Sequence, residues 1–329
     1  TGGGGMKLSK IALAHLPTRI EYLSRLSEVL GGPQIYCKRD DQTGLGFGGN
    51  KIRKLEFLLA DAMDHQARTL VSVGAIQSNH CRQVAALAAR AGLDCILVLS
   101  GEKPEIATGN LYLDQLFGAE IVWADRENRL QVLDTIIEQT RNDGRAPYKI
   151  PYGGSNAVGV MGYLEAMHEL REDEKKQGFN FNWIVTASSS GGTQSGMILG
   201  SLVWLFTGKI LGIAIEGTTA ELGQTIRQLI KECMELNQLH LRVPESLINV
   251  NDAYTGKGYG IMGEPEIEAI RLFAQHEGLL LDPVYTSRAA AGMIDLIRNG
   301  FFRKEDKVLF WHTGGTPALF GEPYLSQLQ

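Results

Sequence analysis

Short apolar runs alternate with amphipathic stretches along most of this chain, and this alternation limits the folds open to it. Four strand-like runs lie between residues 70 and 151, namely Leu70–Val73, Cys95–Leu99, Ile121–Ala124 and Tyr148–Pro151. Helical stretches at 80–91, 108–117 and 127–141 separate them. Strands that alternate with helices predict a parallel sheet with right-handed crossovers. The fold class is therefore α/β.

A second series of the same kind follows, with strand-like runs at Trp183–Ala187, Ile210–Ile215 and Val308–Trp311. Because 329 residues suffice for two domains, we expect two three-layer domains, each built on a parallel sheet. The small α/β domain is expected at 53–162, and the large domain at 6–52 with 163–329. Residues 20–30 are predicted to form one amphipathic helix. Residues 1–5, before Met6, are typical of a cloning remnant.

Composition argues against several classes of protein. The net charge of −5 gives no basic footprint for nucleic acid. The four cysteines show no C-x-x-C spacing and the seven histidines no H-E-x-x-H motif, which argues against a metal site and a disulfide framework. No apolar run reaches the roughly 18 residues of a membrane span, and no signal peptide is visible. We expect a cytoplasmic protein without nucleic-acid, membrane or metal partners.

A glycine-rich turn, Gly44–Gly49, leads directly into a helix whose first turn carries Lys51. Glycine permits positive φ and close approach of another group. A lysine fixed beside such a turn can be desolvated, with a lowered pKa, and can serve as a nucleophile or form a Schiff base.

The same turn has two other interpretations. Its glycines fit the G-x-G-x-x-G dinucleotide fingerprint, but that fingerprint needs an acid at the end of the next strand. The next strand-like run ends in Gly74 and Ala75 instead. The turn could also do no more than shape the fold.

Three loops place polar groups directly after strand-like runs. Ser188–Gly196 opens a helix with hydroxyls, glycines and free amides, which predicts an anion cradle. No G-x-x-x-x-G-K-[ST] motif is present, so a single phosphate fits better than a nucleoside triphosphate. Ser78 is a candidate N-cap, and the amides after it could bind a carboxylate.

The third loop region lies near the C-terminus. Tyr285 is either a core residue or a phenol in the site, while Thr286 and Thr313 either cap helices or face a ring nitrogen. A lysine, a single-phosphate cradle, a carboxylate cradle and polar groups for a heterocycle together fit pyridoxal 5′-phosphate (PLP). PLP forms a Schiff base with a lysine and acts as an electron sink.

Five motifs in order carry a resemblance to a known family: Lys38–Asp41, Gly48–Glu56, Gly74–His80, Leu281–Thr286 and His312–Gly315. On these residues the chain resembles the tryptophan synthase β-like PLP enzymes, fold type II, from about Ile20 onward. More closely it resembles the branch that holds 1-aminocyclopropane-1-carboxylate (ACC) deaminase and D-cysteine desulfhydrase. The resemblance implies a homodimer that acts on a small amino acid.

The resemblance also implies roles for individual residues. The implied catalytic residues are Lys51, as the Schiff-base lysine, Ser78 and Tyr285. The implied cofactor-binding residues are Lys51, Asn50, Asn79 (to the PLP 3-hydroxyl), Ser190, Gly191, Gly192 and Thr193 (to the phosphate), Thr286 and Thr313. The implied substrate-binding residues are Ser78, Asn79, His80, Tyr259 and Tyr285. His80 is assigned no chemical step.

Two positions separate the activities within this branch. ACC deaminases carry a glutamate after the tyrosine that corresponds to Tyr285, and a leucine in a His-Leu-Gly-Gly motif, where this chain has Thr286 and Thr313. A carboxylate beside the pyridine nitrogen deepens the electron sink, whereas hydroxyls do not. The two threonines resemble the D-cysteine desulfhydrase pattern and imply β-elimination of D-cysteine.

Other activities stay open at this point. Within the family they are ACC deaminase and other β-eliminating lyases such as L-cysteate sulfo-lyase. From other classes come an NAD-dependent oxidoreductase and a non-catalytic PLP carrier.

Overall fold

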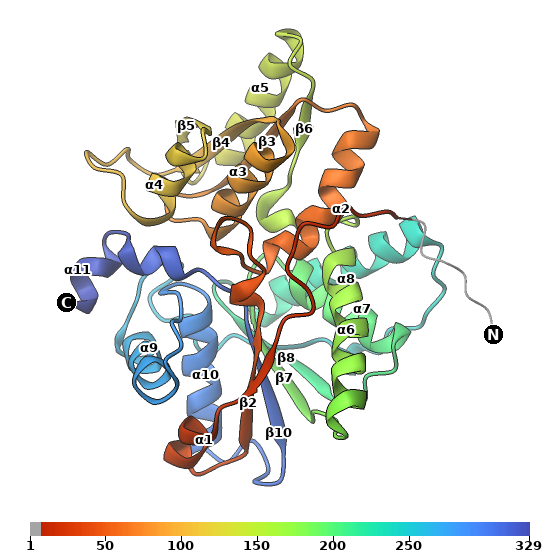
Figure 1. The fold of residues 1–329 in the computed structure, drawn as a ribbon, viewed down its shortest axis with the longest axis vertical. Helices are drawn as coiled ribbons and strands as arrows, with labels where there is room; N and C mark the ends of the chain where they lie inside the picture. Colours follow the sequence, from red (N-terminus) through yellow and green to blue (C-terminus); the bar gives the residue numbers. More distant parts are fainter. Residues whose placement is uncertain (1–7) are drawn as a thin grey trace.

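The structure is a computed structural model that describes residues 8–329, so the expected remnant at 1–5 lies outside the described residues. Two sheets organise the chain, one above the other in Figure 1. The fold is the α/β class expected from the sequence, and most predicted strands and helices are confirmed with small shifts in their bounds.

The smaller sheet has the order β5-β4-β3-β6 and is parallel throughout. Its strands are β3 (Thr69–Ala75), β4 (Asp94–Ser100), β5 (Glu120–Ala124) and β6 (Pro147–Lys149). One face is covered by α2 (Lys51–Asp64), α3 (Asn79–Ala91) and α4 (Gly109–Leu116), and the other face by α5 (Arg129–Asn142). Because both faces are buried, the two central strands, β3 and β4, are nearly continuous apolar runs.

The larger sheet has the order β1-β2-β10-β7-β8-β9, and only β1 runs antiparallel to its neighbour. Its strands are β1 (Ile20–Tyr22), β2 (Gln34–Arg39), β7 (Trp183–Ser188), β8 (Lys209–Ala214), β9 (Asn249–Asn251) and β10 (Lys307–His312). One face packs on α1 (Ser24–Leu30), α9 (Glu264–Glu277) and α10 (Thr286–Arg298), and the other on α6 (Met161–Gln177), α7 (Gly192–Val203) and α8 (Thr219–Asn237). Figure 1 shows these helix groups on opposite sides of the strands.

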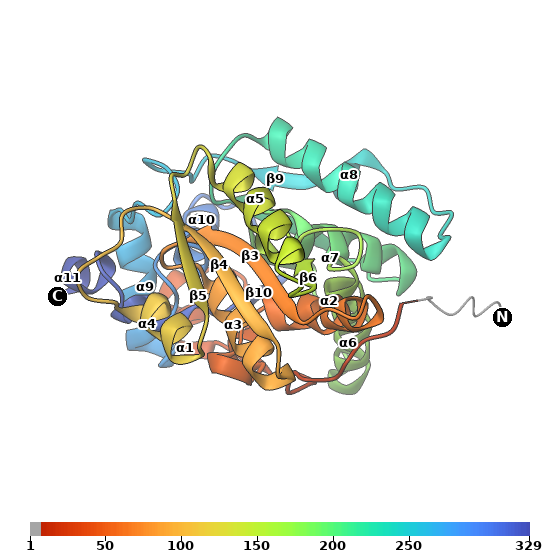
Figure 2. The ribbon, with the colours of Figure 1, turned by 90° about the horizontal axis from the view of Figure 1, so that it is seen from above.

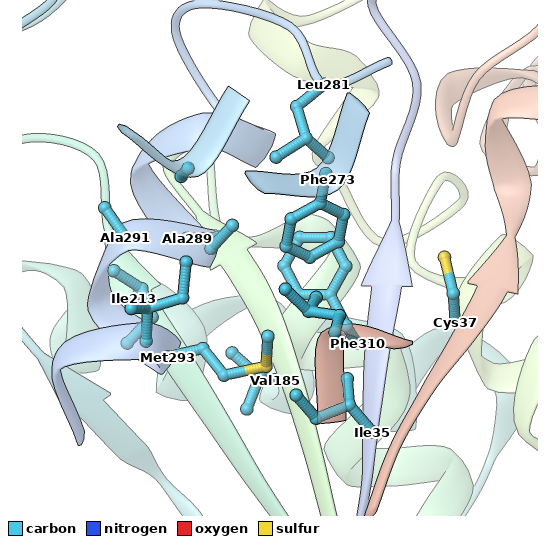
Figure 3. Close-up of a cluster of buried hydrophobic side chains, with 14 of the residues drawn as sticks. Ile35, Cys37, Val185, Ile213, Phe273, Leu281, Ala289, Ala291, Met293 and Phe310 are labelled. Atoms are coloured by element: carbon cyan, nitrogen blue, oxygen red, sulfur yellow. The ribbon is translucent and has the colours of Figure 1, made fainter. Parts of the chain in front are cut away.

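The larger unit has a core cluster on each face of its sheet, and one of them lies between the strands and α1, α9 and α10. Figure 3 shows Phe273 of α9 and Phe310 of β10 at its centre, with ring centroids 5.3 Å apart. Ile213 and Met293 close the cluster from β8 and α10. This packing fixes where the sheet strands end, and the loops at those ends form the site.

The expectation of one helix over 20–30 is wrong. Residues Ile20–Tyr22 form β1, which pairs with β2, and only Ser24–Leu30 is helical. The strand-like run that precedes Asp282 is not a strand either, although Leu279 and Leu281 are buried in it.

The C-terminal segment returns to the smaller unit. After the 3₁₀ turn Thr316–Phe320, which contacts α4, comes α11 (Tyr324–Leu328). Figure 2 shows α11 at the end of the molecule away from α8. None of the helices within residues 8–329 is both long and apolar enough to cross a lipid bilayer.

Candidate active site

A pocket lies between the two sheets and is lined by the loops that follow β3, β7 and β10, together with the start of α2. Loops at the carboxyl ends of parallel strands are where α/β folds bind ligands. The lining includes ten of the residues predicted from the sequence, namely Asn50, Lys51, Ser78, Asn79, His80, Ser190, Gly191, Thr193, Tyr285 and Thr313. Residues far apart in the chain therefore meet as predicted.

Lys51 is the first residue of α2, and it lines this pocket. Burial lowers its pKa from the ordinary value near 10.5 to about 8. A lysine with this pKa has a substantial neutral fraction near neutral pH, as a nucleophilic amine requires.

The glycine turn that precedes Lys51 packs closely against the side chains of Gln83 and Arg82. Gly48 and Gly49 have φ of 72° and 132°, and a Cβ on Gly49 would lie 2.6 Å from the Gln83 amide. The carbonyls of Gly46 and Gly48 accept hydrogen bonds from Arg82. The turn therefore presents carbonyls to a buried cation, so the dinucleotide interpretation of this turn is wrong.

The loop predicted as an anion cradle, Ser188–Gly196, leads into α7. The hydroxyls of Ser188 and Ser189 are buried without a hydrogen-bond partner among the described residues. Ser190 and Ser155 share a hydrogen bond of 2.7 Å between their hydroxyls, and the Asn50 side-chain amide donates to Thr193 over 3.0 Å. Buried hydroxyls without partners at a helix N-terminus fit a bound phosphate. Gly192 does not line the pocket, and its amide donates to Ser155.

Sequence reasoning missed Lys54, which is fully buried one helical turn after Lys51. Its Nζ donates to the Gly153 carbonyl over 3.2 Å, and burial and the Lys51 charge lower its pKa well below the ordinary value. A Cβ on Gly153 would clash with the Ser190 hydroxyl, so Lys54 reaches the edge of the cradle. A buried ammonium beside the cradle could hold an anionic phosphate. Its spacing from Lys51 was the signal that could have revealed it.

Ser78 caps α3 as predicted, since its hydroxyl accepts from the Cys81 amide over 3.0 Å. The amides of Asn79 and His80, in the first helical turn, have no carbonyl partner within the helix. These are the amides that the sequence predicts for binding a carboxylate, and that role stays a prediction. The His80 Nε2 bonds to the Ser72 hydroxyl over 2.8 Å, so His80 also has a structural role.

The two predicted tyrosines differ in their access to the pocket. Tyr285 lines the pocket, whereas Tyr259 does not, but the hydroxyls of the two tyrosines are hydrogen-bonded. Burial, and then the neighbouring Tyr259, raises the pKa of Tyr285 well above its ordinary value. The Tyr285 hydroxyl therefore keeps its proton and can donate a hydrogen bond in the pocket.

Thr286 and Thr313 have different environments. Thr313 lines the pocket. Thr286 is fully buried, does not line the pocket, and donates its hydroxyl to Asp282 over 2.7 Å. The Asp282 carboxylate accepts hydrogen bonds from this hydroxyl and from the amides of Val284, Tyr285 and Thr286. Neither interpretation of Thr286 fits these contacts, because its hydroxyl bonds to Asp282, and it is the Asp282 carboxylate that accepts the amides at the start of α10.

Comparison with known proteins identifies the family. Residues 11–314 match the family described as "Pyridoxal-phosphate dependent enzyme". A D-cysteine desulfhydrase of Klebsiella pneumoniae (strain 342) is 40% identical over 326 residues, which cover 97% of this chain and 98% of the relative. An ACC deaminase of Rhizobium radiobacter is 39% identical over 329 residues, 97% of this chain and 98% of that protein.

Solved structures agree with this result. The crystal structure of an ACC deaminase homologue has a TM-score of 0.89 at 37% identity, and the match covers 98% of this chain and 96% of that one. A threonine deaminase has a TM-score of 0.63 at 19% identity, over 91% of this chain and 92% of that one, and shows the fold alone.

The chain therefore belongs to the pyridoxal-phosphate dependent enzymes, with fold type II, and within them to the group that includes D-cysteine desulfhydrase and ACC deaminase. Its cofactor is PLP, and the pocket has groups that fit one: an amine with a lowered pKa and buried hydroxyls that have no hydrogen-bond partner within residues 8–329. A second buried lysine, Lys54, lies beside the pocket. When bound, PLP supplies an electron sink for the substrate's Cα.

Proposed function

We propose that this protein is a lyase that converts D-cysteine and water to pyruvate, hydrogen sulfide and ammonia. The observation that carries the proposal is the absence of any aspartate or glutamate among the described residues that line the pocket. The nearby Asp282 carboxylate accepts its hydrogen bonds from the loop that follows it, at residues 284–286. Without a carboxylate to keep the ring nitrogen protonated, the electron sink is shallow.

A shallow sink favours a reaction that expels a leaving group over one that opens an unactivated cyclopropane ring. In β-elimination, the electron pair left at Cα is used at once to break the Cβ–S bond. Similarity along the whole chain does not separate the activities, since identity to the desulfhydrase and the deaminase is 40% and 39%. Thr286 and Thr313, at the two positions that distinguish the branch, support the same choice.

In this proposal each group in the pocket has a distinct task. Lys51 Nζ holds the cofactor and, once released, takes the Cα proton, since its pKa of about 8 suits a base. Ser78 and the first amides of α3 bind the substrate carboxylate. Asn79 donates to the cofactor's 3-oxygen, and Ser190, Gly191 and Thr193 hold its phosphate with Lys54 as counter-charge. The Tyr285 hydroxyl donates a hydrogen bond to the departing sulfur.

We also propose a cytoplasmic homodimer with the domain limits given above, 53–162 for the smaller unit. The location is supported by the four cysteines, all of which are buried and unpaired. The dimer rests on the family resemblance.

The test is product analysis of the PLP-loaded protein with D-cysteine, L-cysteine, L-cysteate and ACC in parallel. Pyruvate with sulfide from D-cysteine as the main activity is the expected result. 2-Oxobutyrate from ACC as the main activity would overturn the proposed substrate, and sulfite from L-cysteate would indicate the sulfo-lyase.

A further inference from the structure

Asn110, at the start of α4, lies outside the pocket but touches a residue that lines it. Its Nδ2 donates to Asn79 Oδ1 over 2.8 Å and to the Gln77 carbonyl over 2.8 Å. Its Oδ1 accepts from Arg82 Nε over 2.7 Å. Asn110, Arg82 and Asn79 are all buried.

The orientation of the Asn110 amide is fixed by neighbours that each have one hydrogen-bonding role. A guanidinium only donates, so the Asn110 oxygen must face Arg82. A carbonyl only accepts, so the Asn110 nitrogen must face Gln77. The same nitrogen donates to Asn79 Oδ1, so the contacts with Arg82 and Gln77 also fix which group of Asn110 faces Asn79.

The fixed Asn110 nitrogen in turn determines the Asn79 amide. Since Asn79 Oδ1 accepts from Asn110, Asn79 Nδ2 lies on the other side of the amide. A Cβ built on Gly315 would lie 2.5 Å from that nitrogen, which places it beside the loop of Thr313–Gly315. Asn79 and Thr313 both line the pocket. Because the Asn79 oxygen faces Asn110, the side-chain group that Asn79 has free for a ligand in the pocket is its NH2 donor, not an acceptor.

We propose that Asn110 is a positioning residue that, backed by Arg82, holds Asn79 with its N–H groups toward the 3-oxygen of PLP. The proposal rests on the contact between Asn79 and this oxygen given under Proposed function. An N–H donor stabilises the ionised oxygen, whereas the amide oxygen of a reversed Asn79 would repel it.

The backbone around Asn110 is held as firmly as its side chain. The Asn110 amide donates to Gln77 Oε1 over 2.9 Å, and Gln77 Nε2 donates to the Thr108 carbonyl over 2.9 Å. Asn110 cannot therefore follow Asn79 if Asn79 moves, and a change at 110 acts on the Asn79 amide.

Asn110→Asp tests the proposal, because a carboxylate still accepts from Arg82 but cannot donate to Asn79. Asn79 is then expected to turn its nitrogen toward Asp and its oxygen toward the pocket. We expect the dissociation constant of PLP from the apoprotein to rise about tenfold, the equivalent of one lost charge-assisted hydrogen bond. The visible absorption band of the loaded protein should also lose intensity at fixed pH. Asn142→Asp, the same change at an exposed position of the same unit, is the matched control and should alter neither reading.

A double-mutant cycle with Asn79→Ala separates positioning from general stability. If Asn110 acts through Asn79, Asn110→Asp adds nothing to the dissociation constant or the spectrum once Asn79 is alanine. Additive effects would overturn the inference. If Asn79→Ala alone changes neither reading, the proposed contact of Asn79 with PLP fails, and the inference fails with it. If Asn79→Ala has an effect and Asn110→Asp does not, only the inference fails.

Asn110→Ala replaces Asn110→Asp if the buried carboxylate prevents folding, which circular dichroism of the apoprotein reports. Alanine removes the constraint on Asn79 without imposing the reversed orientation. A smaller rise in the PLP dissociation constant, about threefold, is then expected, again absent in the Asn79→Ala background. Unchanged binding in a folded Asn110→Ala protein would contradict the inference.

Discussion

Arg53 Nε lies 2.7 Å from Asp40 Oδ2, and the same guanidinium reaches Glu169 Oε2 at 2.9 Å through Nη2. Arg53 and Asp40 are almost fully buried, and Arg53 is only two residues along α2 from Lys51. The pair joins α2 to the segment after β2 and to α6. It ties the helix that carries the reactive lysine to the larger sheet.

Removal of Arg53 should be costly, because it leaves a buried carboxylate unpaired. Arg53→Met is expected to lower the free energy of unfolding by about 3–5 kcal/mol, measured by urea denaturation of the apoprotein at neutral pH. Burial alone would raise the pKa of Asp40, but the Arg53 charge outweighs burial and holds it below the usual range. This stabilisation is present above the unfolded pKa, near 3.9, and is lost as pH falls through the folded pKa. The difference in unfolding free energy between wild type and Arg53→Met should therefore become smaller in strong acid. A difference that does not change with pH would contradict a stabilising Arg53–Asp40 ion pair.

Mutation should distinguish the proposed role of Lys51, which forms the Schiff base, from that of Lys54, which binds the phosphate. Lys51→Ala is expected to abolish the visible absorption band that added PLP gives, because no amine remains to form the Schiff base. Lys54→Gln should keep the band and raise the PLP dissociation constant about tenfold, since it removes a charge-assisted contact to phosphate. A visible band in Lys51→Ala without added amine would show that another residue holds the cofactor.

The lowered pKa of Lys51 predicts how the apoprotein captures PLP. Only the neutral amine attacks the aldehyde, so the capture rate should rise with pH through about 8 and then level off. Stopped-flow absorbance from pH 6 to 10, roughly, is the measurement. A rate that continues to climb toward the ordinary lysine pKa near 10.5 would mean that Lys51 is not desolvated.

The two threonines should respond differently to loss of their hydroxyls. Thr286→Val deprives the buried Asp282 carboxylate of a donor and should lower the free energy of unfolding by about 1–3 kcal/mol, with little change in the cofactor spectrum. Thr313→Val should leave stability nearly unchanged but shift the spectrum, because Thr313 lines the pocket. Thermal unfolding and absorption spectra of both PLP-loaded variants show whether each threonine affects stability or the cofactor. A spectral shift in Thr286→Val alone would restore Thr286 as a residue that faces the ring.

Sequence patterns predicted the fold and most of the residues that line the pocket, because both depend on local signals. Apolar runs located β3, β4, β7 and β8, and the glycine turn pointed to Lys51, which lines the pocket. Prediction failed where contacts with residues far along the chain determine the secondary structure. Ile20–Tyr22 has the spacing of a helix, but its backbone pairs with β2, and tertiary pairing outweighs local propensity.

The supporting residues could not be predicted for the same reason. Nothing around Asn110 in the sequence indicates that it meets Asn79 and Arg82, because those contacts join separate elements. Thr286 and Thr313 follow similar apolar runs, yet only Thr313 reaches the pocket. The difference is the Asp282 carboxylate, which draws the Thr286 hydroxyl into its own loop.

The pairing of β2 with β10 places Gln34–Arg39 alongside Lys307–His312. A Cβ on Gly314 would lie 2.9 Å from the Gly49 Cα, so the turn that presents Lys51 is completed by residues far along the chain. A ribosome synthesises Gly314 long after Lys51. The turn therefore cannot reach its final packing until Gly314 has been synthesised, so the segment around Lys51 is completed late in synthesis.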